Sequence, residues 1–324
     1  MLHNLHSATA NLSRCIAARI RLTMSPMKTL MRFNTWLRER FGCRAQRVAL
    51  HTGLSCPVRD GTLATGGCIY CNNLAFNRGA AEPPLPLAVQ LREGMSAARR
   101  RYKAQQFIAY FQTYTATHGP IAAVSAQWEE ALAQPGVVGL AVGARPDTLP
   151  PPVVEFLARL AERTMVWIEI GVQSTHDNSL QWMERGHDWP AARQALRNCR
   201  DAGLLVAAHM ILGLPGENTS AARDSGARLA EAGIHGVKLH HLHAVRGTKL
   251  GELYLASRWL PVTAGEYADQ AAALLGELAD GTVVLRLSGD CLPELLLAPE
   301  WGTDKQQVEQ MIVDRLSAAS VTLR

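Results

Sequence analysis

Three cysteines close together are the residues of this chain most capable of chemistry. Cys56, Cys68 and Cys71 lie within sixteen residues, in the segment Cys56-Pro-Val-Arg-Asp-Gly-Thr-Leu-Ala-Thr-Gly-Gly-Cys68-Ile-Tyr-Cys71. A CxxC pair can place two sulfurs on one metal or cluster, and the eleven residues before Cys68 can curl so that Cys56 returns to the same place. The positive φ angles that such a wrap requires are permitted by three glycines of the loop, Gly61, Gly66 and Gly67.

Three sulfur ligands predict an open site. A structural zinc ion takes four protein ligands, whereas a four-iron cluster held by three cysteines keeps one iron free for another ligand. The alternative is a zinc site completed by Cys43 or His51, both upstream in the sequence. Cys43 precedes the first predicted strand and is expected at the opposite end of the fold from the loop, which disfavours zinc. A redox dithiol formed by Cys68 and Cys71 is a further, weaker alternative.

The remaining cysteines argue against a disulfide framework. The chain has seven cysteines, an odd number, and Cys15, Cys43, Cys199 and Cys291 are scattered. A reducing compartment follows, and the expected location is the cytoplasm. No apolar run approaches the roughly 18 residues that a membrane-spanning helix requires, so no membrane association is expected.

The elements that position this loop alternate between strands and helices. The 324 residues are 48% hydrophobic, enough for a sizeable core. Short apolar runs predict six strands, at residues 47–51, 107–111, 137–142, 165–170, 205–212 and 236–241. Helical periodicity between them predicts helices at residues 87–104, 121–133, 151–162, 189–202 and 219–232.

Repeated strand-helix units require parallel pairing with right-handed crossovers. Six units favour an α/β fold built on a partial (β/α)6 TIM-like barrel, with an open doubly wound sheet as the alternative. Barrel enzymes carry their chemistry at the carboxyl ends of the strands. Polar residues follow the predicted strands at these ends: Gln112 and Thr113, Arg145 and Asp147, Gln173 and Ser174, and residues 215–217.

Three regions are expected along the chain. Residues 1–40 form a basic N-terminal leader and a helix, partly disordered, residues 41–245 form the barrel, and residues 246–324 form a C-terminal α/β extension packed on it. The extension has predicted helices at 249–257, 264–279 and 301–316, and a strand at 283–287. Residues 1–47 hold nine Lys or Arg and one acid, a net charge of +8, whereas the other residues together carry −3. Alternatively, translation starts at Met24 or Met27 and the first residues are loosely ordered.

The cysteine loop after the first strand resembles that of the radical S-adenosylmethionine (SAM) superfamily. The commonest spacing there is C-x3-C-x2-C, and the C-x11-C-x2-C spacing of this chain instead resembles the YhcC/YtqA-type family, relatives of the Elongator catalytic subunit. Further matches are the segments beginning at Phe107, Pro135, Arg145, Glu169, Arg185 and His209, among them Glu169-Ile-Gly-Val-Gln-Ser and His209-Met-Ile-Leu-Gly-Leu-Pro-Gly-Glu. Leu285-Arg-Leu-Ser-Gly-Asp290 is similar to a C-terminal element of these relatives.

The resemblance implies a [4Fe-4S] cluster on Cys56, Cys68 and Cys71, with SAM chelating the fourth iron through its amino and carboxylate groups. One electron, from a donor such as flavodoxin or ferredoxin, would cleave SAM to a 5′-deoxyadenosyl radical that removes a hydrogen from the substrate. Tyr70 matches an aromatic position near the adenine. Kinship with Elongator implies RNA modification, in particular at a tRNA wobble uridine, although a protein or a small metabolite could also enter the barrel.

The same resemblance suggests further SAM contacts. Gln112 and Thr113 would approach its amino acid end, and Glu169, Gln173 and Ser174 its ribose, since a carboxylate accepts strong hydrogen bonds from hydroxyls. For Glu169 the alternative is a salt bridge in the barrel lumen with a residue such as Arg145. Gly213 and Gly216 would let the backbone pass close to the adenine, but an ordinary turn capped by Asn218 or Thr219 explains them equally.

Two other groups of residues have a structural and a functional interpretation. His240, His241 and His243 suggest a metal, but along a strand His241 and His243 face one side and His240 the other, which disfavours a three-histidine site. Packing is the expected role, and the alternative for one of them is a polar lumen or substrate contact. Residues 99–103, Arg-Arg-Arg-Tyr-Lys, could contact phosphates or simply complement a helix dipole. The competing hypothesis for the whole chain is a non-catalytic, zinc-stabilised nucleic-acid-binding protein that uses the same three cysteines with Cys43.

Overall fold

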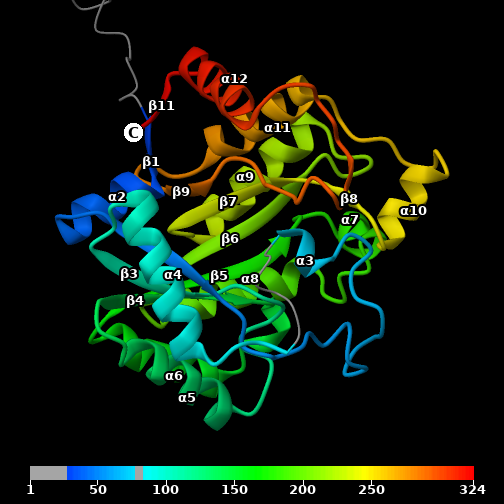
Figure 1. Cartoon of the computed structure of the whole chain (residues 1–324). Coiled ribbons are helices and arrows are strands. Elements are labelled where there is room, and N and C mark those ends of the chain that lie inside the picture. The colour runs from blue at the N-terminus through cyan, green and yellow to red at the C-terminus, as the bar shows by residue number, and fades with distance from the viewer. Residues whose placement is uncertain (1–27, 77–82) are drawn as a thin grey trace, which may run out of the picture.

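A computed structural model describes residues 28–76 and 83–324 and shows a partial barrel of parallel strands (Figure 1). The predicted strands are β2 (Ala45–Leu50), β3 (Gln106–Phe111), β4 (Val137–Ala144), β5 (Met165–Gln173), β6 (Leu205–Leu212) and β7 (Gly236–His241). Each pairs in parallel with the next in chain order. The predicted (β/α)6 fold class is confirmed.

The predicted crossover helices cover the outside of these strands. They are α4 (Leu87–Tyr102), α5 (Ile121–Leu132), α6 (Pro151–Ala161), α8 (Trp189–Asp201) and α9 (Thr219–Ala232). Their apolar faces bury Leu91, Trp128 and Leu157 completely against the outer faces of the strands. Burial of this outer core is the main apolar contribution to stability, because strands covered on both faces remove most of their surface from water.

A second apolar core fills the N-terminal end of the barrel lumen. Helix α2 (Phe33–Phe41) inserts Phe33 and Leu37 beside Trp167 of β5 and Ile108 of β3. The Trp36 ring packs edge-on against Trp167, with 5.3 Å between centroids. Chemistry in the lumen is therefore confined to its middle and its carboxyl-terminal end.

The N-terminal region joins the sheet instead of remaining separate. Strand β1 (Lys28–Arg32), inside the expected leader, pairs in parallel with β9 (Val283–Arg286) and β11 (Val321–Leu323). The helix expected within residues 1–40 is α2, whereas the expectations for residues 1–27 lie outside the described residues. The extension likewise shares the sheet of the barrel, because β9 pairs with β7. Sequence patterning missed β1 and β11 because both are too short to show periodicity.

The extension also contributes helices and a small second sheet. Helices α11 (Ala264–Glu277) and α12 (Lys305–Ala318) pack together beside β9, and α10 (Lys249–Leu255) lies apart from them (Figure 1). Helix α12 begins four residues later than expected, because the Asp304 side chain caps it by accepting from Gln307 N. Strands β8 (Ala244–Val245) and β10 (Leu296–Ala298) pair antiparallel.

The barrel is open at one side. Within the described residues the strand order runs β11-β1-β9-β7-β6-β5-β4-β3-β2, so β2 ends the sheet and does not pair with β9. Helix α2 contacts both strands at the N-terminal end of this gap. Three shorter helices, α3 (Asn73–Phe76), η2 (Pro146–Thr148) and α7 (Asp177–Trp182), lie in the loops near the carboxyl ends of the strands. Among the described residues, no helix has the length and apolar character needed to cross a membrane.

Candidate active site

The three cysteines face one cavity at the carboxyl ends of the strands. The cavity has a volume of about 200 Å³, and Cys56, Cys68 and Cys71 all line it. Cys56 and Cys68 are buried, and Cys71 is half-buried. The loop thus brings the three cysteines to the border of one space, where the strands of a barrel direct their chemistry, and their convergence on one cluster stays a prediction.

Backbone hydrogen bonds hold the cysteine loop in this shape. The carbonyl of Cys56 accepts from Arg59 N at 2.8 Å, and that of Val58 accepts from Gly67 N at 2.8 Å. The CxxC turn closes through Cys71 N donating to Cys68 O at 3.0 Å. All three loop glycines have positive φ, as predicted: 91° at Gly61, 90° at Gly66 and 83° at Gly67.

The zinc alternative does not form in the structure. Cys43 lies between α2 and β2, at the end of the barrel opposite the loop. His51 is buried, and its Nδ1 accepts from Gly53 N at 3.0 Å. No three His, Cys, Asp or Glu side chains of the described residues are arranged to hold a single metal ion. A four-iron cluster is different, because each thiolate binds a different iron, so its cysteines must border one cavity without converging on one point.

The chemistry of the thiols fits such a cluster. Burial, together with the neighbouring Cys68, raises the pKa of the Cys71 thiol to about 12. The Cys71 thiol therefore resists ionisation in the absence of a metal. Coordination removes this difficulty, because a metal-bound thiol is deprotonated outright. The donor set is thus suited to an iron-sulfur group that accepts the charge.

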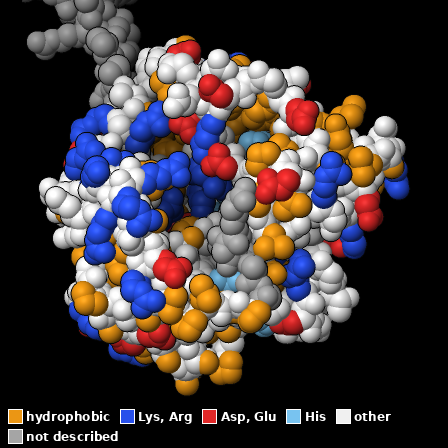
Figure 2. All heavy atoms as spheres, viewed as in Figure 1, with side chains coloured by type: hydrophobic (Ala, Val, Ile, Leu, Met, Phe, Trp, Pro, Cys, Tyr) orange, Lys and Arg blue, Asp and Glu red, His pale blue; other side chains and the backbone are white. Residues whose placement is uncertain are grey.

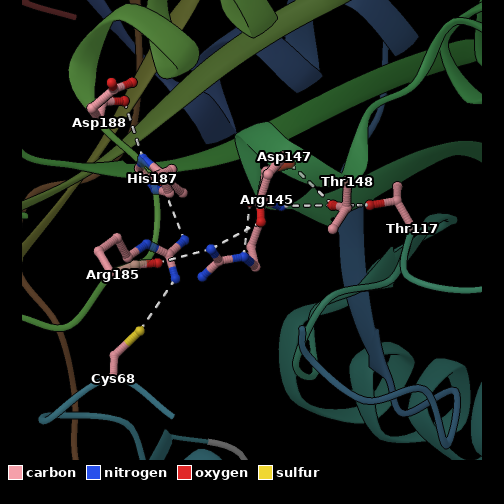
Figure 3. A network of polar contacts seen from close by, with 9 residues as sticks. Cys68, Thr117, Arg145, Asp147, Thr148, Arg185, His187 and Asp188 are labelled. Atoms are coloured by element: carbon pink, nitrogen blue, oxygen red, sulfur yellow. Dashed lines mark hydrogen bonds and ion pairs between the residues drawn. The ribbon is translucent and has the colours of Figure 1, made fainter. Parts of the chain in front are cut away.

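A buried arginine pair supports the cysteines (Figure 3). Arg185 Nη1 lies 3.5 Å from Cys68 Sγ, and Arg185 Nη2 donates to Gly171 O at 2.8 Å. Arg145 Nη2 donates to the Arg185 carbonyl at 2.8 Å, and its Nε donates to Asp147 at 2.9 Å. Burial alone would lower the pKa of Arg185, but Tyr70 and Cys68 raise it above its ordinary value. Arg185 therefore places a permanent positive charge against one thiol.

The arginine pair is itself anchored through neighbouring polar groups. Thr148 Oγ1 donates to the Arg145 carbonyl at 3.0 Å and bonds Thr117 Oγ1 at 2.7 Å (Figure 3). Arg145 Nη1 and Arg185 Nε are buried and have no hydrogen-bond partner among the described residues. Both residues line the cavity. These unused donors mark the place where an anionic group of a bound molecule would be received.

Four of the predicted SAM contacts line the cavity with the cysteines: Tyr70, Gln112, Glu169 and Gln173. Gln173, at the end of β5, has a φ of 71°, and Tyr114, just after β3, has a φ of 54°. Such conformations cost of order 1–3 kcal/mol each in residues other than glycine and cluster at functional sites. The strand ends that face the cavity are therefore held in strained conformations.

The other four predicted SAM contacts do not line the cavity. Thr113 is buried behind it, and Ser174 Oγ donates to Glu217 at 2.5 Å. Gly213 and Gly216 have φ values of 81° and 79°, and an added Cβ at Gly213 would lie 2.9 Å from Val262 Cγ2. Asn218 caps α9 by accepting from Ser220 N and Ala221 N. The interpretation of this segment as a capped turn is confirmed, and a role in adenine binding stays a prediction.

Glu169 lies in a lumen salt bridge, as its alternative interpretation predicted, but not with Arg145. Its carboxylate accepts from Arg47 at 3.0 Å, Lys238 at 3.1 Å and His209 at 2.6 Å, and from the Tyr110 hydroxyl at 2.8 Å. Burial would raise the pKa of Glu169, but Lys238 and Arg47 hold it well below its ordinary value of 4.5. Contact with ribose stays a prediction for this residue, which also lines the cavity.

The histidines separate as the strand alternation predicted. His241 stacks on His243, with 3.9 Å between ring centroids. His240 instead faces His209 across the lumen, with 6.2 Å between centroids. Burial lowers the pKa of His209 to about 4 and that of His241 to about 2, so both are neutral near pH 7.

Several residues of the site had no role assigned from the sequence. Arg185 lies within a segment noted only for its resemblance. Arg47 and Lys238 are cations inside strands that are predicted to be buried. Because an unpaired charge in such a strand is costly, each cation indicates a partner elsewhere in the fold. The acid that pairs with both, Glu169, lies 122 residues from Arg47, so local spacing could not reveal the group.

Comparisons with known proteins support the resemblance. The model of the radical SAM superfamily matches residues 63–225, and that of the radical SAM C-terminal domain matches residues 234–318. The chain is 33% identical to YtqA of Bacillus subtilis over 275 residues, 85% of each protein. It is 33% identical to YhcC of Escherichia coli K12 over 279 residues, 86% of this chain and 89% of YhcC.

The structure of the archaeal Methanocaldococcus infernus Elp3, lacking residues 1–46, shares the fold. It superposes with a TM-score of 0.64 at 15% identity, over 85% of this chain. The match covers 63% of the Elp3 chain, so this chain spans less than two thirds of it. At that identity the likeness concerns the fold alone.

Proposed function

The chain belongs to the radical SAM superfamily, and we propose on this premise that the enzyme acts on tRNA, at the side chain of a wobble uridine. It is an enzyme that cleaves SAM with a [4Fe-4S] cluster. When bound, the cluster would supply the electron for this cleavage. The residues of the chain bind, orient and shield the reactants.

The roles of the residues follow from their positions around the cavity. Cys56, Cys68 and Cys71 would hold three irons and leave the fourth open. Tyr70 would lie along the adenine, and Gln112 and Gln173 would offer amide hydrogen bonds to SAM at the strand ends. The unused donors of Arg145 and Arg185 are suited to the SAM carboxylate, because charged hydrogen bonds to carboxylates are strong. Burial of the cavity shields a radical from water and side reactions.

A cationic hollow beside the open edge of the barrel carries the proposal of an RNA substrate. Figure 2 shows Lys and Arg side chains gathered around a hollow beside α2 and β9. Arg32, Arg47, Arg286 and Lys305 line it, with Glu309 as an acidic neighbour. Positive charge in a concave surface attracts a polyanion and steers it toward the site. The sequence resemblance to relatives of the Elongator catalytic subunit also implies an RNA substrate.

Modified nucleosides test this proposal. Total tRNA from a deletion strain and from its parent would be digested and compared by mass spectrometry. We expect one uridine derivative to disappear in the deletion strain and to return with the wild-type gene but not with Cys68→Ala. An unchanged nucleoside profile contradicts the proposal and turns attention to a protein or small-molecule substrate.

The remaining partners are also proposals. The enzyme requires a one-electron donor, and we propose a flavodoxin or ferredoxin. We propose the cytoplasm as its compartment, because all six described cysteines are free of disulfides.

Substitution of Arg185 should change the redox properties of the cluster. Arg185→Gln removes the positive charge beside Cys68, so an added electron is stabilised less and the midpoint potential becomes more negative. Cluster retention should fall about ten- to a hundredfold, as is typical when a partner of a ligand is removed. A redox titration monitored by electron paramagnetic resonance measures the potential. Arg193→Gln, on the exposed face of α8, is the control, and equal potentials in the two variants would contradict the role of Arg185.

A further inference from the structure

The middle of the barrel lumen holds more positive charge than its own acid can balance. Arg47 of β2 and Lys238 of β7 pair with one carboxylate, Glu169 of β5, and Arg286 of β9 lies close to Arg47. Arg286 stands next to Lys238 in the parallel register of β7 and β9. His209, the other neighbour of Lys238 in register, is neutral near pH 7 and adds no negative charge. With Lys238 protonated, the group therefore has a formal charge of +2.

Arg286 is the cation of this group that has no acidic partner among the described residues. Among the described residues it forms no ion pair, and Glu169 is held by the other two cations. Its Nη2 contacts the His240 ring at both ring nitrogens, and its Nε is buried without a hydrogen-bond partner among the described residues. Burial and Arg286 itself hold the pKa of His240 well below its ordinary value, so this histidine is no counter-charge.

The acids nearest to Arg286 are already paired. Glu309 accepts from Arg32 at 3.5 Å, and Asp290 accepts from Lys305 at 2.5 Å. A buried guanidinium without a counter-ion is costly, and fixed donors in such a place usually serve an anion. The pKa of Lys238 is lowered to about 7, mainly by burial. Glu169 opposes this shift, whereas Arg286 and Arg47 add to it.

The lumen group can be reached from outside. Arg47 and Arg286 line the hollow beside α2 and β9, which has a volume of about 300 Å³. Lys238, Glu169 and His240 line the cavity of the cysteines. The two spaces are neighbours, and the contacts of Arg47 with Glu169 and of Arg286 with His240 lie between them. A molecule in the hollow at the open edge of the barrel can thus touch Arg47 and Arg286, next to Lys238.

We propose that Arg286, with Lys238 and Arg47, binds a phosphate group of the substrate in the barrel lumen. The planar fork of arginine matches phosphate oxygens, lysine adds a point charge, and a phosphate balances a surplus of +2 better than a single carboxylate does. The inference rests on the proposed function in placing the substrate beside the cysteines. In an RNA, the phosphate would belong to a nucleotide turned out of its stack into the lumen.

Binding of small nucleotides tests this site on the cluster-loaded, SAM-bound enzyme. The probes are uridine 5′-monophosphate, ribose 5-phosphate and uridine, measured by isothermal titration calorimetry. We expect both phosphates to bind and uridine to bind at least about tenfold more weakly. Arg286→Gln should weaken binding of the phosphates about ten- to a hundredfold, which is the usual effect of losing a hydrogen bond to a charged group.

Two further variants make the result decisive. Arg286→Lys keeps the charge and should restore most of the affinity, and Arg163→Gln, in an exposed ion pair with Glu129, should bind like the wild type. The visible absorption of the cluster and circular dichroism report whether each variant is folded and loaded. If Arg286→Gln does not fold, the comparison of phosphates with uridine on the wild type and on Arg286→Lys decides.

The outcomes separate this inference from the function on which it rests. Equal affinity for uridine and its monophosphate, or unchanged binding in folded Arg286→Gln, overturns the phosphate site even if the tRNA profile changes on deletion. Phosphate binding that depends on Arg286, with an unchanged tRNA profile, supports the site, rejects the RNA substrate and indicates a small phosphorylated molecule.

Discussion

Cys68→Ala protein is expected to retain almost no iron and to produce no 5′-deoxyadenosine when reduced with dithionite in the presence of SAM. Cys68 is buried, borders the cavity and contacts Arg185, so alanine removes a ligand that no neighbouring side chain can replace. With two thiolates left, the cluster is neither held nor shielded. Chromatography of the reaction products and iron analysis of the purified protein measure both effects.

Two cysteines outside the cavity provide the controls. Cys43 lies at the other end of the barrel, and Cys199 is buried on α8. Cys43→Ala and Cys199→Ala should keep their iron and their rate of SAM cleavage close to the wild-type values. Loss of the cluster in Cys43→Ala, with retention in Cys68→Ala, would mean that the ligand set is assigned wrongly.

Glu169→Gln should cause the largest loss of stability among substitutions in the lumen. The carboxylate accepts from Arg47, Lys238 and His209, and a neutral amide leaves the two cations without an acid. Breaking a buried ion pair by removing one partner costs about 3–5 kcal/mol. Denaturant unfolding at pH 7 measures the loss, and Glu155→Gln, an exposed residue of α6, should change the free energy of unfolding by less than about 0.5 kcal/mol.

The stabilisation by Glu169 has a defined pH dependence. The pKa of Glu169 in the folded protein is lower than its ordinary value of 4.5, which approximates the unfolded chain. The folded state therefore binds fewer protons, and the contribution is complete above about pH 4.5 and disappears as the pH falls through the lower, folded pKa. Below neutral pH, the stability difference between wild type and Glu169→Gln should shrink in that acidic range. A difference that is small at pH 7 would show that the ion network adds little stability.

Much of the fold could be predicted from the sequence because strand and helix periods are local. Strands β6 and β7 and helix α9 have the predicted ends, and the other predicted elements except α12 differ by one to three residues. The start of α12 was misplaced because Asp304 caps the helix inside an otherwise periodic segment. Strands β1 and β11 pair over distances of about 290 residues, which no local pattern reports.

The site was predictable where its residues share a loop and not where they meet across the barrel. The cysteine loop carries its own spacing and glycines, so the common cavity could be expected. The alternative interpretation of Glu169 was a salt bridge with a residue such as Arg145, but the parallel register directs Glu169 to Lys238 and Arg47, while Asp147 and the Arg185 carbonyl hold Arg145. Such choices among charged partners depend on register and burial, which only the folded chain defines.

The metal content of protein purified without oxygen tests the central claim most directly. Iron, acid-labile sulfide and zinc would be measured on the same sample of the wild-type enzyme. The arrangement of Cys56, Cys68 and Cys71 predicts a brown protein with about four irons and four sulfides per chain. A colourless protein that carries one zinc per chain and no iron would contradict it.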